Sequence, residues 1–324
     1  MTEKLKIIAG SLSKIDGLEI RKNYPLSRLT SIGTGGRAQI YLSVARIGAL
    51  KEAMKLISGP FLILGSGTNI LISDRDFPGV IIHLSGGFRR LRIQGDRIAC
   101  GAAVPLARLV KKAIENSFAG FEELSGVPGS VGGAAAMNAG THITELGDLV
   151  ETLWMVDTTG KRRAFSRGAI RKKYRSSLAP APGVIASLSF RRLPGGDRRL
   201  QAERAESLVS GRKLKHPCRE RTFGSTFKNP PGKIAAELID KAGLKGYCIG
   251  GARVSPLHAQ FIENSQGASA LDILALIKHV RQVVQQRYGV LLEPEVKLAG
   301  FTAEELGDLA QYAVSVVNKS ARHQ

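Results

Sequence analysis

Two glycine-rich segments constrain the fold of this chain more than any other feature. The first, GSGTNI (65–70), directly follows the buried-strand pattern FLIL, and the second is GVPGSVGG (126–133). Glycine permits backbone conformations and close approaches that other residues do not, and successive N–H groups in such loops can point at one anion. Polar side chains within the loops can add hydrogen bonds: Ser66, Thr68, Asn69 and Ser130. We therefore expect an anion-binding site built mainly from backbone.

The arrangement of the glycines excludes the Rossmann type of dinucleotide site, which needs a strand before the glycines and a helix after them. GTGGRA (33–38) is followed by the strand-like QIYLSV, while GSGTNI lacks the third glycine and opens no helix. Each loop alone could be a tight turn, because short motifs match by chance. Two such loops in one strand-rich region predict a non-Rossmann dinucleotide site, with backbone wrapped around a pyrophosphate.

Composition places the chain among ordinary globular proteins. Its 324 residues suffice for two or three domains, and 43 % are hydrophobic and 23 % charged. No apolar run reaches the roughly 18 residues of a membrane span, and the N-terminal run IIAG is too short for a signal peptide. The cysteines Cys100, Cys218 and Cys248 form no CxxC motif, so neither a disulfide framework nor a zinc site is expected. We expect a cytoplasmic protein without a metal or a membrane partner.

Hydrophobic periodicity predicts a strand-rich region followed by a more helical one. Strands are expected at 39–44, 60–65, 79–84, 89–104, 149–157, 184–193 and 290–300. Helices are expected at 45–57, 105–117, 232–242 and 269–287, with helical spacing again in the tail after residue 300. Between the two regions, DRRLQAERAESLVSGRKLK (197–215) is typical of a solvated basic helix.

The chain is strongly basic, with a net charge of +20. Residues 161–221 hold 18 Lys and Arg against 4 Asp and Glu. A nucleic-acid surface is one interpretation, but aromatic residues for base stacking are sparse there and no known nucleic-acid-binding motif occurs. We prefer the alternative that the basic surface attracts small anionic ligands, and we expect no nucleic-acid partner.

Six motifs follow one another along the chain: LGSGTNILISD (64–74), ELSGVPGSVGGAAAMNAG (123–140), YRSS (174–177), GSTFKNP (224–230), LIDKAGLKGYCIGGARVSPLHAQFIEN (238–264) and GVLLEPEV (289–296). Their order and spacing resemble those of the UDP-N-acetylenolpyruvoylglucosamine reductases, also called UDP-N-acetylmuramate dehydrogenases or MurB. The resemblance covers most of the chain from about residue 22 to residue 300.

The resemblance implies an α+β fold: an FAD-binding fold of the vanillyl-alcohol-oxidase (PCMH) type with two α+β subdomains, plus a C-terminal α+β substrate-binding domain. Accordingly we expect an N-terminal helix and extension (1–21), the FAD-binding domain (22–195), a basic linker helix (196–222), the substrate-binding domain (223–300) and a C-terminal tail helix (301–324). The segment 197–223 shows no inserted cap with a substrate-contacting tyrosine, which some members carry. The tail lies beyond the matched motifs, and we expect it to pack on the body.

The implied reaction reduces UDP-GlcNAc-enolpyruvate to UDP-N-acetylmuramate, with NADPH as reductant and FAD as cofactor. This is a cytosolic step of peptidoglycan synthesis, and with it of cell-wall biogenesis. We expect the chain to act as a monomer on this UDP-sugar. The implied FAD contacts are Gly65, Ser66, Gly67, Thr68, Asn69, Gly126, Val127, Pro128, Gly129, Ser130, Gly133, Asn138 and Gly140.

Hydride addition to the vinyl carbon leaves negative charge on the neighbouring carbon and its carboxylate. The reaction therefore needs a cation and a proton donor. The resemblance assigns the cation to Arg175, the proton donor to Ser225 and a further catalytic acid to Glu295. From the residues alone, Arg175 could be one more surface arginine, and strand alternation puts Glu293 on the same face as Glu295. Thr226 is the lesser alternative to Ser225.

Three residues are implied in substrate binding: Tyr174, Lys228 and Asn229. The resemblance places the asparagine near the UDP group, and a lysine suits a diphosphate as a point charge. A lone histidine is more often structural, so His258 receives no catalytic role. After the NAG of the second loop, Thr141-His142-Ile143 replaces the usual Tyr-Gly-like pair, which removes no catalytic group.

Other functions stay open at this point. A different flavoprotein of the same fold would share the glycine loops but has no reason to carry GSTFKNP and EPEV. A nucleic-acid binder would hold no flavin and would bind DNA with a strong salt dependence. A degenerate homologue is disfavoured because Arg175, Ser225 and Glu295 are all present.

Overall fold

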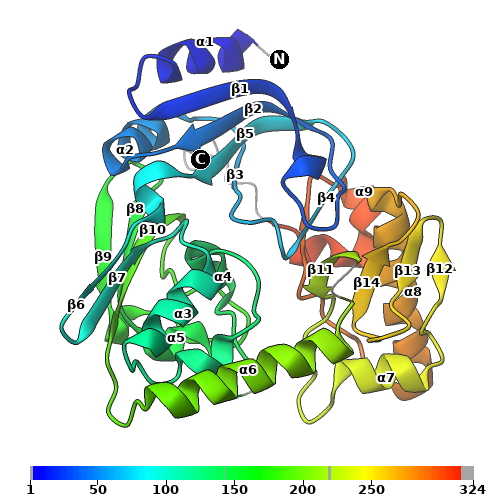
Figure 1. The fold of residues 1–324 in the computed structure, drawn as a ribbon. Coiled ribbons are helices and arrows are strands. Elements are labelled where there is room, and N and C mark those ends of the chain that lie inside the picture. The colour runs from blue at the N-terminus through cyan, green and yellow to red at the C-terminus, as the bar shows by residue number, and fades with distance from the viewer. Residues whose placement is uncertain (1–2, 142, 218–219, 315–324) are drawn as a thin grey trace.

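The computed structural model describes residues 3–141, 143–217 and 220–314. Two β-sheets with their helices form one body, and a third sheet with its helices forms the other (Figure 1). The long helix α6 (Arg198–Lys215) spans from one body to the other along one side (Figure 1). In the described part of the chain, no helix is long and apolar enough to cross a membrane.

The first sheet has the strand order β1-β2-β5-β3. Its strands are β1 (Leu18–Pro25), β2 (Arg37–Val44), β3 (Phe61–Ile63) and β5 (Phe77–Leu84). β1 is antiparallel to β2, whereas β2 and β3 both run parallel to β5. The helices α1 (Glu3–Leu12) and α2 (Ile47–Leu56) bury their apolar sides in one hydrophobic core with side chains of this sheet. The glycine segment 33–38 leads into β2, as its exclusion from the Rossmann class predicts.

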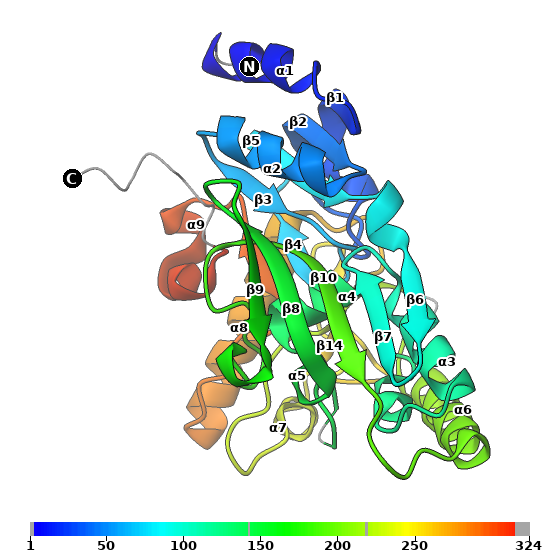
Figure 2. The same ribbon diagram turned by 90° about the vertical axis from the view of Figure 1, so that its left-hand side faces the viewer.

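The second sheet is antiparallel throughout, in the order β6-β7-β10-β8-β9 (Figure 2). Its strands are β6 (Leu91–Gln94), β7 (Arg97–Gly101), β8 (Val150–Asp157), β9 (Arg162–Ser166) and β10 (Gly183–Arg191). Three helices lie between β7 and β8 in the chain: α3 (Leu106–Glu115), α4 (Val131–Met137) and α5 (Leu146–Leu149). Short 3-10 helices occur at Leu26–Arg28, Gly86–Arg89, Phe121–Leu124 and Arg167–Ala169.

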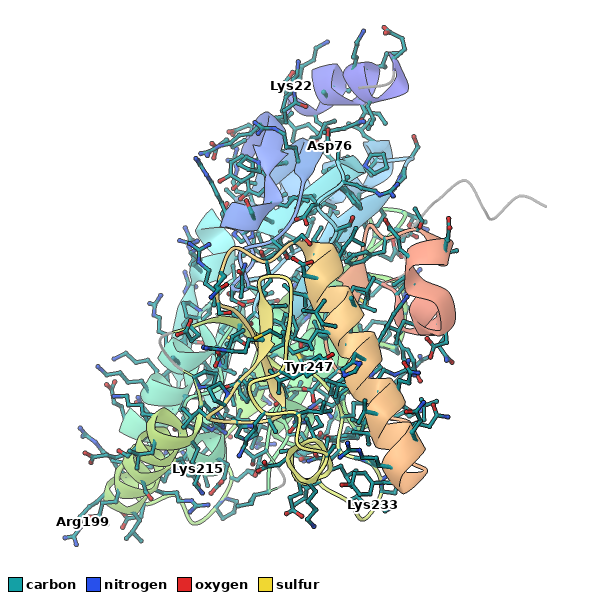
Figure 3. All side chains as sticks on the ribbon, turned by 90° about the vertical axis from the view of Figure 1, so that its right-hand side faces the viewer. Lys22, Asp76, Arg199, Lys215, Lys233 and Tyr247 are labelled. Carbon is teal, nitrogen blue, oxygen red and sulfur yellow. The ribbon has the colours of Figure 1, made fainter. Side chains whose placement is uncertain are left out.

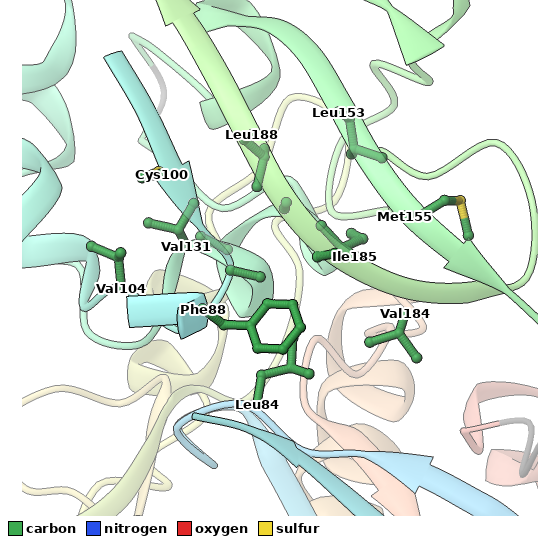
Figure 4. Close-up of a cluster of buried hydrophobic side chains, with 14 of the residues drawn as sticks. Leu84, Phe88, Cys100, Val104, Val131, Leu153, Met155, Val184, Ile185 and Leu188 are labelled. Carbon is green, nitrogen blue, oxygen red and sulfur yellow. The ribbon is translucent and has the colours of Figure 1, made fainter. Parts of the chain in front are cut away.

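The two sheets share one continuous hydrophobic core. Leu84 from the first sheet and the adjoining Phe88 lie close to Val184 and Ile185 of the second (Figure 4). Because each sheet buries apolar side chains against the other, the two form one support for the loops between them.

The C-terminal body is built on the third sheet, which is antiparallel and has the strand order β11-β14-β13-β12. Its strands are β11 (Arg221–Ser225), β12 (Cys248–Ile249), β13 (Ala252–Val254) and β14 (Phe261–Asn264). The helix α8 (Ala270–Tyr288) contacts β12 and β13, and α7 (Ala235–Lys241) packs beside α8. Its core also takes in Ile32 and Leu71 from the N-terminal part of the chain.

A parallel strand pair joins the two bodies. β15 (Lys297–Ala299) follows the C-terminal sheet in sequence but pairs with β4 (Ile70–Ile72), which directly follows the first glycine loop. The expected strand at 290–300 forms only over these three residues. Pro294, which has no N–H to donate, makes a single bridge with Phe227 instead.

The described part of the tail packs on the body, as expected. Its helix α9 (Ala303–Leu306) and the 3-10 helix Gly307–Tyr312 bury Leu306 and Leu309 in the C-terminal core. The Arg75 guanidinium also pairs with Glu305 at 2.8 Å, which ties the tail to the first body. Residues 315–324 of the predicted tail helix lie outside the described residues.

The helix α6 is held to the first body mainly by polar contacts. Its buried Gln201 donates a hydrogen bond to the Phe118 carbonyl at 2.7 Å, and Arg204 pairs with Glu123 at 2.8 Å. Basic side chains such as Arg199 and Lys215 project into solvent (Figure 3). The structure therefore confirms a solvated basic helix in this segment.

Further details differ from the sequence expectations. Periodicity predicts no strand at β1, β9, β11, β12, β13 or β14, all of which the structure contains. β1 begins at Leu18, ahead of the limit expected at residue 22, and the glycine segment 126–133 opens a helix at Val131 that periodicity did not predict. The domain limits themselves stay a proposal. Cys100 and Cys248 are free thiols, whereas Cys218 lies outside the described residues.

Replacing Phe121 with alanine tests the shared core. Phe121 is 1 % exposed, and its ring meets those of Phe118 and Phe190 edge-on. We expect the free energy of unfolding to fall by about 3–5 kcal/mol. Urea unfolding followed by fluorescence of Trp154, which lies on β8 in the same sheet as Phe190, measures this change.

The matched control is Leu214→Ala on α6, because Leu214 is 78 % exposed. It should change the free energy of unfolding by less than about 0.5 kcal/mol. Equal losses in the two variants would contradict the packing described for Phe121.

Candidate active site

A cavity of about 1700 Å³ lies where the two glycine loops meet the C-terminal body. Its wall includes residues from five segments: 65–69, 126–133, 222–225, 294–297 and 311–314. A pocket for one small ligand measures roughly 300–1,000 Å³. The cavity therefore has room for more than one ligand.

The first glycine loop turns away from the end of β3. The Leu64 N–H still donates to the Ile82 carbonyl at 2.9 Å, and the chain then leaves the sheet. Gly67 adopts a φ of +66°, and a Cβ there would lie 1.8 Å from the Leu29 carbonyl oxygen, so this position requires glycine. Within the described part of the chain, the N–H groups of residues 65–69 donate to no acceptor.

The second loop makes backbone hydrogen bonds to the protein at its C-terminal end, whereas several N–H groups at its N-terminal end have no partner among the described residues. The N–H groups of Val131 and Gly132 donate to carbonyls beyond β7, and the Ser130 hydroxyl caps α4 by accepting from the Gly133 N–H. Among described acceptors, none pairs with the N–H groups of Gly126, Gly129 and Ser130. The two loops are adjacent, since a Cβ on Gly65 would lie 2.9 Å from Ser130 Oγ.

These unpaired donors allow a test of whether the site fits FAD. Successive N–H groups in a loop that have no internal acceptor favour an anion. The donors of segments 65–69 and 126–130 belong to residues that line one cavity. Their number and placement fit the pyrophosphate of a dinucleotide. Among the described residues, no cluster of histidine, cysteine and acidic side chains could hold a metal ion.

Arg175 reaches the cavity with a left-handed backbone conformation, at a φ of 49°. Its side chain is 13 % exposed and makes four hydrogen bonds. Nε donates to Glu295 Oε1 at 2.9 Å, and Nη2 donates to the Gly140 carbonyl at 3.0 Å. Nη1 donates to Glu145 Oε1 at 3.1 Å and to the Asn138 carbonyl at 3.3 Å. A strained backbone held in this way is typical of functional sites.

The structure distinguishes the two carboxylates of EPEV. Glu295 lines the cavity with 12 % of its side chain exposed, whereas Glu293 is 53 % exposed and pairs with Lys228 at the rim. Burial raises the pKa of Glu295, and the Arg175 guanidinium opposes that shift. Glu295 is therefore the carboxyl that can hold a proton inside the cavity.

Ser225 is brought to Glu295 by backbone pairing. It ends β11, where the register with β14 shifts, and such an irregularity re-aims a side chain. The carbonyl of the next residue, Thr226, accepts from the Glu295 N–H at 2.8 Å. Ser225 lines the cavity, while Thr226 is fully buried and does not. The geometry thus favours Ser225 over Thr226.

Two lysines add positive charge to the same wall. Lys228 and Lys297 both line the cavity. The pKa of Lys297 is lowered, first by burial and then by Lys228. In the described part of the chain, the Lys297 ammonium pairs with no carboxylate, which leaves it available to an anionic ligand.

The cavity wall includes most of the predicted site residues. The exceptions are Asn138, Tyr174 and Asn229, whose predicted roles stay predictions. Asn138 is 1 % exposed, and its amide is used by Glu145 and the Gly147 N–H. Tyr174 lies under the Arg175 guanidinium, 4.7 Å from ring centroid to Cζ. The Asn229 side chain accepts from the Ala235 N–H at 3.1 Å, at the start of α7.

Among the groups that sequence reasoning missed are Glu145, Lys297 and the tail segment 311–314. Glu145 contacts Arg175 from 30 positions away in the chain, and no spacing rule connects them. Lys297 follows the EPEV motif by one residue, which was the available signal. The tail segment 311–314 borders the cavity, although it lies beyond every recognised motif. Asn69 differs in another way: its amide donates to the Glu295 carbonyl at 3.2 Å, so it also joins the two bodies.

Comparison with known proteins agrees with this architecture. Residues 38–166 match the family model of the FAD binding domain. Residues 216–299 match the family model of the C-terminal domain of UDP-N-acetylenolpyruvoylglucosamine reductase. The first match includes both glycine loops, and the second includes Ser225 and Glu295.

Curated relatives match along nearly their whole length. The UDP-N-acetylenolpyruvoylglucosamine reductase of Anaeromyxobacter sp. (strain Fw109-5) is 40 % identical over 301 residues, covering 90 % of this chain and 92 % of that protein. The reductase of Methylorubrum populi is 40 % identical over 287 residues, covering 88 % of this chain and 93 % of that protein.

A solved structure gives the same answer for the fold. The crystal structure of the reductase (MurB) from Thermus caldophilus matches with a TM-score of 0.76 and 31 % identity, covering 87 % of this chain and 99 % of that one. These matches confirm the α+β FAD-binding fold expected from the motifs. The chain belongs to the UDP-N-acetylenolpyruvoylglucosamine reductase family.

Proposed function

We propose that this chain is an FAD-dependent reductase that converts UDP-GlcNAc-enolpyruvate to UDP-N-acetylmuramate with NADPH, in peptidoglycan synthesis. The observation that carries the proposal is the convergence of Arg175, Ser225 and Glu295 on one cavity, beside the unpaired N–H donors of the glycine loops. The glycine loops alone would suit other flavoproteins. We further propose that the protein acts as a monomer in the cytoplasm, without a nucleic-acid partner.

The glycine loops would hold the pyrophosphate of FAD through their N–H groups, since these donors point to no acceptor in the described protein. A flavin held by these loops would supply the hydride-transfer chemistry between NADPH and the substrate. The remaining tasks belong to side chains of the protein: orienting the substrate, stabilising its developing charge and delivering a proton.

Arg175 is proposed to stabilise the substrate carboxylate as negative charge develops on it. A guanidinium stays charged and presents its donors in a planar fork. Four of its five N–H donors have partners in the described structure, which leaves one on Nη2. Because the surrounding acceptors are fixed, this charge is already in place before the reaction.

Glu295 is proposed to donate a hydrogen bond to the substrate carboxylate from its protonated form. Burial raises its pKa, which favours that form. Its bond to Arg175 keeps the two groups on the same side of the cavity, at 2.9 Å. Together a cation and a neutral acid can stabilise a doubly charged enolate better than either alone.

Ser225 is proposed to give its hydroxyl proton to the carbanionic carbon. A serine hydroxyl is a weak acid, so the step needs a strongly basic carbon and a source that restores the proton. Water that enters the open cavity can restore it. Lys228 and Lys297 would attract the diphosphate of the substrate as point charges, and Asn229 and Tyr174 would support the same region.

Substrate-dependent oxidation of NADPH tests the whole proposal. We expect purified protein reconstituted with FAD to oxidise NADPH in the presence of UDP-GlcNAc-enolpyruvate and to form UDP-N-acetylmuramate. The reaction is followed by the absorbance of NADPH and by mass spectrometry of the product. A protein that binds flavin but lacks this turnover would overturn the proposed substrate. Failure to bind FAD would overturn the proposal that the protein is a flavoenzyme.

Ser225→Ala should separate the two half-reactions. Reduction of the flavin by NADPH should stay within about twofold of wild type, while its reoxidation by substrate should slow by about 10²–10⁴-fold, the range of a lost general acid. Stopped-flow flavin absorbance measures both rates. Equal slowing of the two half-reactions would show that Ser225 is not the proton donor.

Glu295→Gln should retain the flavin but change the pH dependence of the second half-reaction. Because burial raises the pKa of Glu295, its protonated form is complete below that pKa and is lost as pH rises through it. Wild-type flavin reoxidation should therefore slow with rising pH, and the variant should lack this limb. An unchanged pH profile, or loss of the flavin, would contradict the role of Glu295.

A further inference from the structure

A tight turn after the second glycine loop fixes the position of Glu145. Gly140 and Glu145 form an antiparallel bridge, and the Leu146 N–H donates to the Ala139 carbonyl at 2.9 Å. A Cβ on Gly140 would lie 2.3 Å from the Thr144 carbonyl oxygen, so only glycine permits this approach. The backbone of Glu145 is thus held against the segment that carries the Gly140 carbonyl.

The Glu145 carboxylate is oriented from both of its oxygens. Oε1 accepts from Arg175 Nη1 at 3.1 Å, and Oε2 accepts from Asn138 Nδ2 at 2.5 Å. The Asn138 amide is fixed in turn, because its Oδ1 accepts from the Gly147 N–H at 2.9 Å. The 21 % exposed carboxylate therefore has a defined direction, unlike a flexible surface acid.

Arg175 needs such support because its backbone is strained. At a φ of 49° a residue with a side chain lies in a sparsely populated region, which persists only when surrounding contacts determine it. The Asn138 and Gly140 carbonyls supply two of these contacts, and they are neutral. Glu295 supplies a third contact, but in the proposed function it holds a proton for the substrate and carries no charge. Glu145 is then the remaining charged partner.

We propose that Glu145 is a positioning residue for the reaction, which holds the Nη1 edge of the Arg175 guanidinium so that its other edge stays aimed into the cavity. This inference rests on the proposed function, because it assumes that Arg175 meets the substrate carboxylate. Burial raises the pKa of Glu145, and the Arg175 guanidinium opposes that shift, as expected for a partly buried acid beside a cation. Glu145 itself does not line the cavity, so it acts through Arg175.

The test compares Glu145→Gln and Glu145→Ala with wild type in the two half-reactions. Flavin content and reduction by NADPH should stay within about twofold, which also shows that the variants fold. Flavin reoxidation by UDP-GlcNAc-enolpyruvate should slow by about tenfold in the glutamine variant and about 100-fold in the alanine variant, the scale of a small misplacement of a reacting group. In an Arg175→Lys background, Glu145→Gln should add less than about twofold, because contacting residues are not additive.

The control is Asp148→Asn, which perturbs the same turn without touching Arg175. The Asp148 carboxylate accepts from the Glu145 N–H at 3.1 Å. Its reoxidation rate should stay within about twofold of wild type. Glu145 variants that match wild type, additive effects with Arg175→Lys, or an Asp148→Asn variant as slow as Glu145→Ala would each overturn the inference. A wild type without substrate turnover would instead overturn the proposed function, and this inference with it.

Discussion

The site depends on one guanidinium that joins the two bodies of the protein. Arg175 donates to the Asn138 and Gly140 carbonyls just after α4, to the Glu145 carboxylate and to Glu295 of the C-terminal body. Its 13 % exposed charge would be unfavourable without partners, so the loop and the C-terminal body must keep one arrangement for all four bonds to form. The contact between Arg175 and Glu295 therefore also joins the two bodies at the cavity.

Backbone pairing keeps those walls in register. β15 pairs with β4 immediately after the first glycine loop, and the Lys297 N–H donates to the Asn69 carbonyl at 3.2 Å. The Asn69 amide reaches the Glu295 carbonyl, and the Thr226 carbonyl accepts the Glu295 N–H. One segment of extended chain thus contacts the glycine loop on one side and the Ser225 segment on the other. The relative position of Ser225, Glu295 and the first glycine loop therefore follows largely from main-chain hydrogen bonds.

Much of this was predictable from the sequence, for physical reasons that also mark the limit. Amphipathic spacing predicted α3, and apolar runs predicted most strands of the two large sheets but not the edge strands β1 and β9, because burial of one face is a local pattern. The order of the motifs along the chain predicted Arg175, Ser225 and Glu295 as site residues. By contrast, Glu145 contacts Arg175 only because of the tertiary fold. Strand alternation also cannot predict that Glu295 is largely buried while Glu293 is exposed. Asn138, predicted as an FAD contact from its place in a glycine motif, also has a structural role that the motif did not reveal: its φ is 46° at the end of α4, and its buried amide serves the turn.

The site also carries features that oppose stability. The N–H groups of residues 65–69 donate to no acceptor in the described protein, Arg175 has a strained backbone, and the Arg175, Glu145 and Glu295 side chains lie mostly out of water. The last two features are unfavourable in the free protein. The continuous core beneath both sheets and the β4–β15 pair offset them at a distance from the cavity. A ligand that brings a pyrophosphate to the loops would satisfy the donors at once, so binding and local stability are coupled in this fold.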